Sequence, residues 1–460
     1  MNEKYYDEIF SLFEEVSNGF KRKNQYFDIL YDAISSVHIT KSPSTEDISL
    51  NNKTSGIVAR TFLGMWEEIA SNNLSDIEKI QESITKVSNM GNKITEFEGW
   101  TLNEEIIPKI DSSKIPIDKK LEKIREIYEY IQNFDNRIVR TEVRYIEFQI
   151  ERIFSNNEGC LLRQVIPRIK LYIIPIAREG AVVDYDYYVK NGEIGFEIFD
   201  ELTTEKLDMI AQNSLDMLKA IAPPSGRSTV ILDPSLTGLI AHESFGHGLE
   251  ADQVLRERSY LKQCLHKKVA SDICKIYDSP SLSGPIGSYF FDDEGIRAGK
   301  NVLVEDGILK NFIYDRRTAS ELNSIPQGNG RRESFAHPIN VRMSNTYFEP
   351  GNHELNEMIS EIHNGVILTH ANFGMEDPIG GGMQVTSKKG YLIENGEKTK
   401  ILRSVALSGS VLELLQNIDA ISKDTLKLDG GTCGKGSEDL VPVSSGGSYM
   451  RVNNAIISQG

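Results

Sequence analysis

The sequence contains few cysteines and no long apolar run. Its four cysteines are scattered over 460 residues and form no Cys-x-x-Cys pair. A chain of this length does not need disulfides to fold, so this usage is typical of a reducing compartment. No apolar run approaches the roughly 20 residues that a membrane helix requires, and the acidic first residues lack the features of a signal peptide. We therefore expect a cytoplasmic protein without a membrane partner.

Positive charge is also scarce. The 51 lysines and arginines are outnumbered by 67 aspartates and glutamates, which gives a net charge of −16 without any block of like charges. Such a field repels phosphate backbones, so we expect no nucleic-acid partner. Apolar residues make up 39% of the chain, which is sufficient for packed cores. The length suggests more than one domain, and the Pro-Pro segment at 223–224 favours a division into residues 1–222 and 223–460.

Residues 1–222 are predicted to form an α/β domain. The first segment, of about 135 residues, is predicted to be mostly helical, because apolar side chains in 118–133 repeat at spacings of three and four. Beyond Arg137 the period changes to two, which predicts strands up to Phe199. Asn191-Gly192 is a typical hairpin dipeptide. Thr203 or Thr204 is expected to cap a last helix that ends before the two prolines.

Residues 223–460 are predicted to form a mainly antiparallel β domain with one metal-binding helix, so the whole chain is of the α+β class. A strand at 229–232 precedes Asp233-Pro234, which is a typical N-cap and first turn of a helix. Asp306-Gly307 and Asn395-Gly396 predict hairpin turns. The glycine-rich segment 430–436 is predicted to be a loop that leaves the sulfur of Cys433 exposed.

The segment His242-Glu243-Ser244-Phe245-Gly246-His247 is the most informative pattern. Neutral imidazoles are good Zn²⁺ ligands, and the adjacent glutamate can accept a proton from a water molecule that the metal has acidified. The spacing is one residue longer than in the familiar HExxH helix. Residues i and i+5 lie roughly 140° apart on a regular α-helix, so both rings can reach one metal only where the turn is widened. We predict a π-type distortion or an early helix end near Gly246, because glycine tolerates distortion best.

A catalytic zinc typically has three protein ligands and one open position. The candidates for the third ligand are Cys433, Glu250 and Asp252, followed by Cys264, Cys274 and His337. A cysteine in a glycine-rich loop suits a ligand, but the residues alone do not choose among these candidates. Two histidines can also merely satisfy local hydrogen bonds. Arg331 or Arg332 can supply an oxyanion donor, although a surface ion pair explains either residue equally well.

These motifs resemble the TldD/PmbA (TldE) family of metallopeptidases, and within it the TldD-type catalytic subunit. The resemblance covers the C-terminal half, where the matching segments follow the family order. They are 242–252, Gly328-Asn329-Gly330-Arg331-Arg332, 345–351, Gly431-Thr432-Cys433-Gly434-Lys435 and, more weakly, 390–396. In that family the histidines of HExxxH and a late cysteine hold zinc. The resemblance therefore implies Zn²⁺ as cofactor, His242, His247 and Cys433 as its ligands, and Glu243 as the general base.

The resemblance also implies a substrate class and a partner. The family cleaves peptides and unstructured polypeptides inside a closed dimer, and its second subunit type lacks the HExxxH motif. We expect a peptide substrate, and a homodimer or a heterodimer with a TldE/PmbA-like paralogue. Two alternatives stay open: a non-catalytic assembly or binding subunit with a structural metal site, and a zinc amidohydrolase acting on non-peptide substrates. A structural site would have four ligands and no open position, and substrate screening would separate the two hydrolases.

Overall fold

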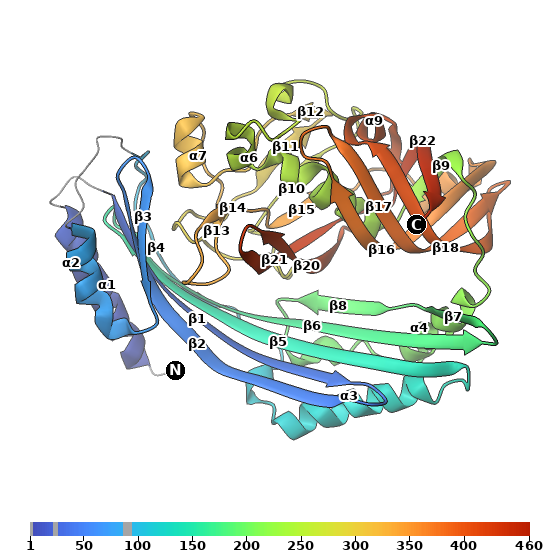
Figure 1. Cartoon of the computed structure of the whole chain (residues 1–460), viewed down its shortest axis with the longest axis horizontal. Coiled ribbons are helices and arrows are strands. Elements are labelled where there is room, and N and C mark those ends of the chain that lie inside the picture. Colours follow the sequence, from blue (N-terminus) through green and yellow to red (C-terminus); the bar gives the residue numbers. More distant parts are fainter. Residues whose placement is uncertain (1–2, 22–25, 86–93) are drawn as a thin grey trace.

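The computed structural model describes residues 3–21, 26–85 and 94–460 (Figure 1). Its N-terminal half is built on an eight-stranded sheet with the order β3-β2-β1-β5-β6-β4, and β7 and β8 also pair with β6. The strands are β1 Phe27–Lys41, β2 Glu46–Phe62, β3 Trp66–Ser71, β4 Thr101–Glu105, β5 Ile138–Asn156, β6 Leu161–Glu179, β7 Val182–Tyr185 and β8 Tyr188–Gly192. The pairs are antiparallel except β4–β6, which is parallel.

The first 135 residues are not mostly helical, so this prediction is wrong. Helices α1 (Glu3–Lys21), α2 (Ile77–Thr85) and α3 (Ile117–Gln132) are separated by strands β1 to β4. In β1, Asp28 and Asp32 lie among apolar residues, and both side chains are buried. The Asp28 carboxylate accepts a hydrogen bond from Arg60, and the Asp32 carboxylate accepts one from the backbone N–H of Phe335. A strand that is covered on both faces does not show the alternation of apolar and exposed residues by which a strand is usually recognised.

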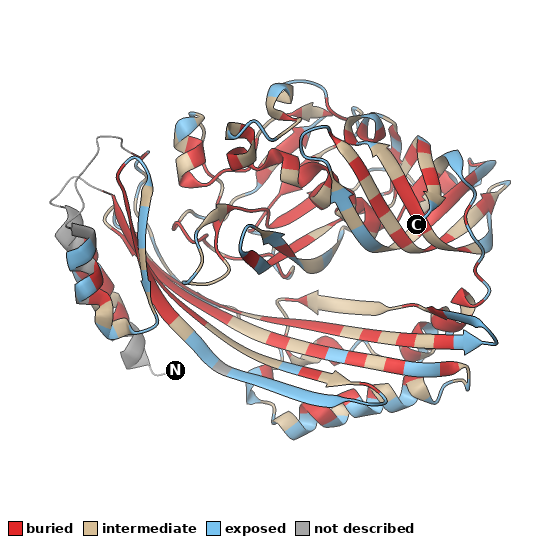
Figure 2. Ribbon diagram, in the orientation of Figure 1, coloured by how far each residue is buried: buried red, intermediate tan, exposed pale blue. Residues whose placement is uncertain are grey.

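Helices α3 and α4 (Thr204–Met217) cover the outer face of the sheet (Figure 1). The apolar stripe predicted in α3 is buried against β5 and β6, together with the stripe of α4. The Thr203 side chain accepts a hydrogen bond from the backbone N–H of Lys206, so the predicted helix cap is confirmed. Figure 2 shows that burial alternates along the long strands, as expected where one face packs on helices.

Asn191 and Gly192 lie within β8 and do not form the predicted hairpin turn. They pair with Lys170 and Ile169 of β6. A Cβ at Gly192 would lie 2.8 Å from the carbonyl oxygen of Gly284. The glycine therefore permits a close approach between the sheet and the C-terminal half, and the local sequence cannot distinguish this role from a turn.

Within the described residues, the C-terminal half contains two six-stranded sheets and one two-stranded sheet. The first has the order β18-β17-β16-β9-β22-β19, and a further β18–β22 pairing closes part of it on itself. Its strands are β9 Gly226–Leu232, β16 Asn364–Glu376, β17 Gly382–Glu394, β18 Glu397–Ser410, β19 Ile418–Ile421 and β22 Met450–Gln459.

The second six-stranded sheet has the order β12-β11-β10-β15-β21-β20, and β13 pairs with β14. The strands are β10 Ile276–Asp278, β11 Asn301–Glu305, β12 Ile308–Leu309, β13 Gly330–Arg331, β14 Asn340–Val341, β15 Asn345–Phe348, β20 Lys427–Lys435 and β21 Glu438–Gly447. Antiparallel pairs predominate, although β9–β16 and β15–β21 are parallel. The expected α+β class is confirmed.

Both hairpin turns predicted in this half are confirmed. Asp306 and Gly307 join β11 to β12 with φ angles of 50° and 73°. Asn395 and Gly396 join β17 to β18 with φ angles of 52° and 81°. Positive φ at both central residues gives a turn whose twist matches that of the flanking strands, which is why these dipeptides are favoured there.

Short helices connect the strands of the C-terminal half. They are α5 (Pro234–Leu239), α6 (Ala251–Leu255), α7 (Arg316–Glu321), α8 (Leu355–Ser360) and α9 (Val411–Gln416). A Cβ at Gly238 of α5 would lie 2.4 Å from the backbone nitrogen of Gly446, so this glycine lets α5 pack closely on β21. Over the described ranges, no helix is both long and apolar enough to span a bilayer.

Buried ion pairs join the two halves, and we call three of them the interface ion pairs. They are Arg60–Glu294 at 3.3 Å, Arg152–Asp293 at 2.6 Å and Arg316–Glu158 at 2.7 Å. Each side chain is at most 10% exposed. Removing one partner of such a pair leaves a buried charge without compensation, so these contacts hold the halves in one arrangement.

Candidate metal centre

The helix that carries the histidines begins where the sequence predicts and then changes its winding. The Asp233 side chain accepts a hydrogen bond from the backbone N–H of Leu236, which caps α5. After α5 the chain forms a π-helical turn, Ile240–Gly246, followed by a 3₁₀ turn, His247–Leu249. The predicted widening near Gly246 is confirmed.

The widened turn places the two histidines side by side. The N–H of His247 donates to the carbonyl of His242, five residues back, and the ring centroids are 5.1 Å apart. Gly246 has an ordinary helical φ of −62°, so it is not needed for an unusual backbone conformation. A Cβ there would lie 2.0 Å from Sδ of Met343 and 2.9 Å from the carbonyl oxygen of Ala241. Close packing, rather than tolerance of distortion, therefore requires glycine at this position.

Cys433 lies on β20 and not in an exposed loop, so this sequence prediction is wrong. The cysteine pairs with Val441 of β21 and is 5% exposed. Gly436, with a φ of 65°, lies in the turn between the two strands. A Cβ at Gly430 would lie 2.2 Å from Oδ1 of Asn191. At this position the glycine serves close contact with the N-terminal sheet, and the strand itself is held by its hairpin partner.

His242, His247 and Cys433 form a cluster with the geometry of a metal site. Their ligand atoms all lie within 4.8 Å of one another, and Sγ of Cys433 is 3.7 Å from Nε2 of His247. Tetrahedral zinc with ordinary Zn–S and Zn–N distances separates such atoms by about 3.6 Å. Nδ1 of His242 is buried and has no hydrogen-bond partner among the residues that the structure describes. The donor set and its spacing therefore fit zinc.

The charges of the cluster favour the thiolate form of the cysteine. Burial alone would raise the pKa of Cys433, but the charges and hydrogen bonds of His242 and His247 lower it to about 5. Burial would likewise lower the pKa of His247, but Glu250 and Cys433 raise it. A thiolate is the form of cysteine that binds metals.

Glu250 and Asp252, two candidates for the third ligand, lie behind the cluster. Oε2 of Glu250 is 3.5 Å from Nδ1 of His247, on the side of the ring opposite Nε2. Lys435 donates to Glu250 at 2.9 Å, to Asp252 at 2.8 Å and to the carbonyl of Val341 at 2.9 Å. Burial would raise the pKa of Glu250, but Lys435 and His247 lower it to about 2. A carboxylate on the far nitrogen of a histidine orients the ring and makes it a better ligand.

The remaining candidates lie outside the cluster. Their nearest polar contacts are Cys264 with the carbonyl of Tyr260, Cys274 with Ser271, and His337 with Ser334. Arg331 donates to the carbonyls of Met343 and Pro442, and Arg332 donates to the carbonyl of His337 and to Glu68. Neither arginine lines the cleft beside the cluster, so the structure does not support them as oxyanion donors there.

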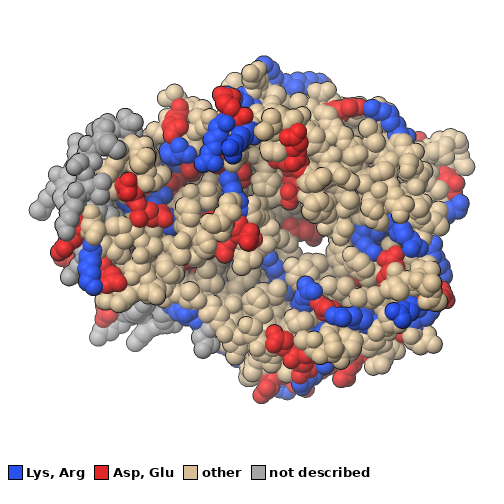
Figure 3. All heavy atoms as spheres, viewed as in Figure 1, with Lys and Arg blue, Asp and Glu red and all other residues tan. Residues whose placement is uncertain are grey.

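Glu243 lies between the cluster and a large cleft. Its side chain is 31% exposed, and Oε2 is 3.9 Å from Nε2 of His247. The cleft measures about 950 Å³ and is lined by His242 and Glu243 together with residues of β6, β8, β16 and β20. It runs between the N-terminal sheet and the C-terminal half, where Figure 3 shows the molecule hollowed. A carboxylate placed in this way can exchange protons with a molecule held in the cleft.

Sequence reasoning missed several polar residues of the cleft. Nδ1 of His370 is 2.6 Å from Oδ1 of Asp186, which comes from the other half of the chain, and the Tyr187 hydroxyl donates to the carbonyl of Ala371. Nearby, burial raises the pKa of Glu376 to about 8. His370 and Asp186 are 184 residues apart. A single sequence contains no local signal for such a pair, although the positive φ of His370, 59°, marks a constrained position in the structure.

Comparison with known proteins agrees with this geometry. The model of the PmbA/TldA metallopeptidase central domain matches residues 110–220, and that of the C-terminal domain matches residues 225–459. The chain is 37% identical to a metalloprotease of Methanothermobacter thermautotrophicus over 75% of both chains. It is 34% identical to a metalloprotease of Methanocaldococcus jannaschii over 93% of this chain and 95% of the relative. It is also 30% identical to the zinc metalloprotease TldD homolog of Saccharolobus solfataricus, over 73% of this chain and 75% of the relative.

Solved structures share the fold over nearly the whole chain. A Thermotoga maritima protein described as a candidate modulator of a DNA gyrase has a TM-score of 0.80 at 21% identity, covering 98% of this chain and 100% of that one. TldE from Thermococcus kodakarensis has a TM-score of 0.74 at 18% identity, covering 98% and 99%. At such identities the likeness shows the fold alone. The sequence matches, together with the His/Cys cluster, show that the chain belongs to the PmbA/TldD family of metallopeptidases.

Proposed function

We propose that this chain is a zinc-dependent peptidase that hydrolyses peptide bonds of unstructured peptides. The observation that carries the proposal is the cluster of His242, His247 and Cys433 with Glu243 beside it at a cleft of about 950 Å³. Among the described residues the cluster offers three protein ligands, which is the number typical of catalytic zinc and one fewer than in structural sites. This count favours a catalytic site over a purely structural one.

The residues of the site have distinct roles in the proposed reaction. His242, His247 and the Cys433 thiolate would hold Zn²⁺, and Glu250 would orient His247 through Nδ1. Zinc, when bound, would supply Lewis acidity toward the scissile carbonyl and the attacking water. Glu243 would take the proton of that water and deliver it to the leaving amine. The cleft would hold the peptide in extended form next to Glu243.

We also propose that the chain works in the cytoplasm as a dimer with itself or with a TldE/PmbA-like paralogue. All four cysteines are free, which suits a reducing compartment. Beside Glu243, the backbone of Gly374 approaches so closely that a Cβ would lie 2.9 Å from Cγ of the glutamate. The same segment exposes Phe373, Met375 and Ile379, each more than half accessible. Exposed apolar side chains near a site are typical of a surface that a partner or substrate covers.

The decisive test compares Glu243→Gln with the wild type. The variant should retain about one Zn²⁺ per chain but lose about 10²–10⁴-fold in peptide hydrolysis, because it removes the proton acceptor and leaves the ligands in place. Glu257→Gln is a matched control, because Glu257 pairs with Lys262 at the surface, and it should behave as the wild type. Activity of Glu243→Gln within a few-fold of wild type would contradict the assigned role.

The assembly is tested separately. Light scattering should give the mass of a dimer, and an unfolded protein should be cleaved much faster than its folded form. A monomer that cleaves both forms equally well would rule out a closed chamber. Screening non-peptide amides under the same conditions distinguishes a peptidase from a broader amidohydrolase.

A further inference from the structure

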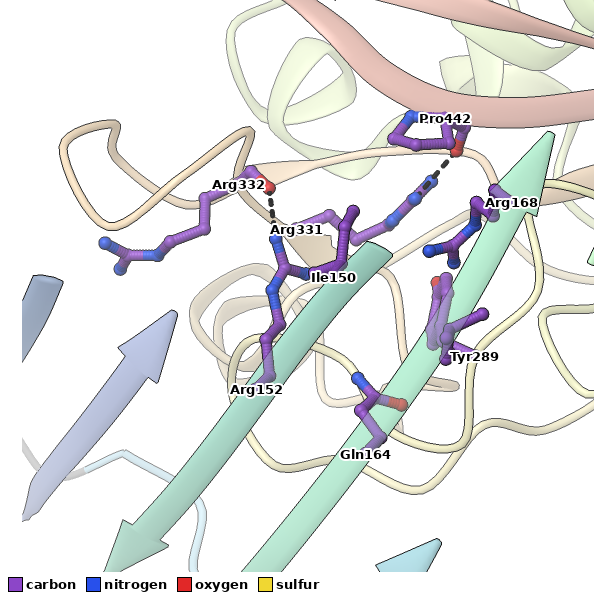
Figure 4. Close-up of a pocket in the computed structure, with 9 residues that line it drawn as sticks. Ile150, Arg152, Gln164, Arg168, Tyr289, Arg331, Arg332 and Pro442 are labelled. Carbon is purple, nitrogen blue, oxygen red and sulfur yellow. Dashed lines mark hydrogen bonds between the residues drawn. The ribbon is translucent and has the colours of Figure 1, made fainter. Parts of the chain in front are cut away.

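The motif Gly328–Arg332 has no role in the proposed function, and its last two residues line a second, much smaller cavity. The cavity measures about 20 Å³, and every lining residue is buried. It is lined by Ile150, Arg152, Gln164, Ile166, Arg168, Tyr289, Arg331, Arg332 and Pro442. These residues come from β5 and β6 of the N-terminal sheet and from the C-terminal half, including β13 and β21 (Figure 4).

Two of the four arginines around the cavity have their charge neutralised. Arg152 pairs with Asp32 at 3.3 Å and with Asp293 at 2.6 Å. The guanidinium of Arg332 points away from the cavity in Figure 4 and pairs with Glu68 at 2.7 Å. What Arg332 contributes to the cavity wall is its carbonyl, which accepts a hydrogen bond from Arg152.

Arg168 and Arg331 are different, because over the described residues neither has a carboxylate oxygen within 4.0 Å. Nε and Nη2 of Arg168 donate to the carbonyls of Ile286 and Ser288, each at 2.7 Å, whereas its Nη1 is buried without a partner. Arg331 donates to two carbonyls and stacks over the ring of Tyr289, 4.8 Å from its centroid. Carbonyls satisfy N–H groups, but they do not cancel a full charge.

Both guanidiniums are cationic at neutral pH. Burial lowers the pKa of Arg168 to about 9, with Glu193 opposing and Arg331 and Arg152 adding repulsion. The pKa of Arg331 is lowered by the same burial. Arginine keeps its proton at neutral pH in folded proteins, so two buried positive charges face one cavity. Such an arrangement is costly unless a negative charge enters it.

We propose that this cavity binds one small monovalent inorganic anion, with chloride as the physiological case, between Arg168 and Arg331. About 10–15 Å³ is needed to hold a water molecule, so a cavity of about 20 Å³ holds one particle somewhat larger than water, such as a monatomic anion, and is too small for phosphate, sulfate and peptide carboxylates. A water molecule fits equally well but brings no charge. The anion would accept from Nη1 of Arg168 and compensate Arg331.

The position of the site gives the anion a structural task. Arg168 belongs to β6 of the N-terminal sheet, and Arg331 holds the carbonyl of Pro442 on β21. Pro442 pairs with Thr432, the neighbour of Cys433 on β20. An anion shared by the two arginines would therefore join the N-terminal sheet to the hairpin that carries Cys433.

Bromide is the probe for the first test, because it resembles chloride and scatters anomalously. Crystals of the full chain grown or soaked in sodium bromide should show an anomalous peak between the guanidiniums of Arg168 and Arg331. A solvent peak at that position without anomalous signal, in crystals that bind bromide elsewhere, would identify water and overturn the proposal.

The second test measures thermal unfolding while sodium gluconate is replaced by sodium bromide at constant ionic strength. Gluconate is too large for the cavity, so the wild type should gain roughly 1–3 °C as bromide rises, and the gain should saturate. Arg168→Gln should lose this response, whereas Arg227→Gln, which changes an exposed arginine paired with Glu413, should keep it. An unresponsive wild type, or a fully responsive Arg168→Gln, would reject the site. If Arg168→Gln does not fold, the anomalous peak and the wild-type response decide.

Discussion

The interface ion pairs and the His/Cys cluster are both buried and polar, but they are balanced differently. In the interface, Arg60 reaches both Asp28 and Glu294, and Arg316 reaches Glu158. In the cluster, three metal-binding atoms lie close together, and Nδ1 of His242 has no hydrogen-bond partner in the described part of the chain. In the interface ion pairs, each buried charge is compensated by a side chain of the protein itself. In the cluster, the ligand atoms stay available to bind a metal ion.

The largest expected difference between the two regions is in metal content. Cys433→Ser should reduce zinc from about one atom per chain to nearly none, because a hydroxyl does not replace a thiolate in a three-ligand site. Cys274→Ser removes another buried thiol, whose sulfur lies 3.5 Å from the Ser271 hydroxyl oxygen, and it should retain the metal. Elemental analysis of the two variants gives the answer. Full zinc in Cys433→Ser would mean that the cluster is not the metal site.

Substitutions in the interface ion pairs should change the stability of the protein but not its metal content. Arg316→Met leaves Glu158 buried without its cation and should lower the free energy of unfolding by about 3–5 kcal/mol. Arg317→Met, at the next position, removes a partly exposed pair with Glu321 and should cost less than about 1 kcal/mol. Urea unfolding measures both values, and zinc per folded chain should not change. Equal costs at 316 and 317 would show that the interface pairs are not the main connection between the halves.

A substitution that disturbs packing at the widened turn should have a smaller effect, but it should change both stability and zinc binding. Gly246→Ala places a methyl group against Sδ of Met343 and should cost about 1–3 kcal/mol while weakening zinc binding. Adding Met343→Ala removes the atom that the new methyl group would meet, so it should restore part of the zinc binding, whereas the loss of the buried Met343 side chain should lower stability further. Unchanged stability and zinc affinity in Gly246→Ala would show that the turn adapts without strain.

The free energy of unfolding should also depend on pH, and this change should be small per pH unit. Burial raises the pKa of Glu376 to about 8, whereas its value in the unfolded chain is near the ordinary 4.5. The folded state therefore favours the protonated carboxyl, so this stabilisation is complete below about pH 4.5 and is lost as the pH rises through 8. One proton gives at most about 1.4 kcal/mol per pH unit.

Glu376→Gln should reduce the loss of stability that the wild type shows as the pH rises. The comparison requires protein from which a chelator has removed the metal, because a bound cation would itself lower the pKa of a nearby carboxyl. Urea midpoints measured at pH 5, 7 and 9 for both chains provide the test. Parallel pH profiles would show that Glu376 is ionised in the folded protein at neutral pH.

The sequence predicted what depends on local geometry. The widened turn was predicted because His242 and His247 would point apart on a regular helix, and the structure contains it. Two hairpin turns were predicted from dipeptides that tolerate positive φ, and both are present. The sequence did not predict β1, because its buried carboxylates find partners far along the chain. It also misassigned Cys433, since the glycines around it serve close packing and not a loop. The domain boundary at residue 222 stays a prediction.

The π-helical turn contains one residue more than a regular helix would need between the two histidines. Removing Ser244 would give the four-residue spacing that suits a regular helix, with both rings still on one face. Because the widened turn already accommodates the extra residue, the segment after the deletion should keep its direction, and Leu249 and Glu250 should stay close to their present neighbours. The longer and the shorter histidine motifs are therefore two windings of one helix that differ by a single residue.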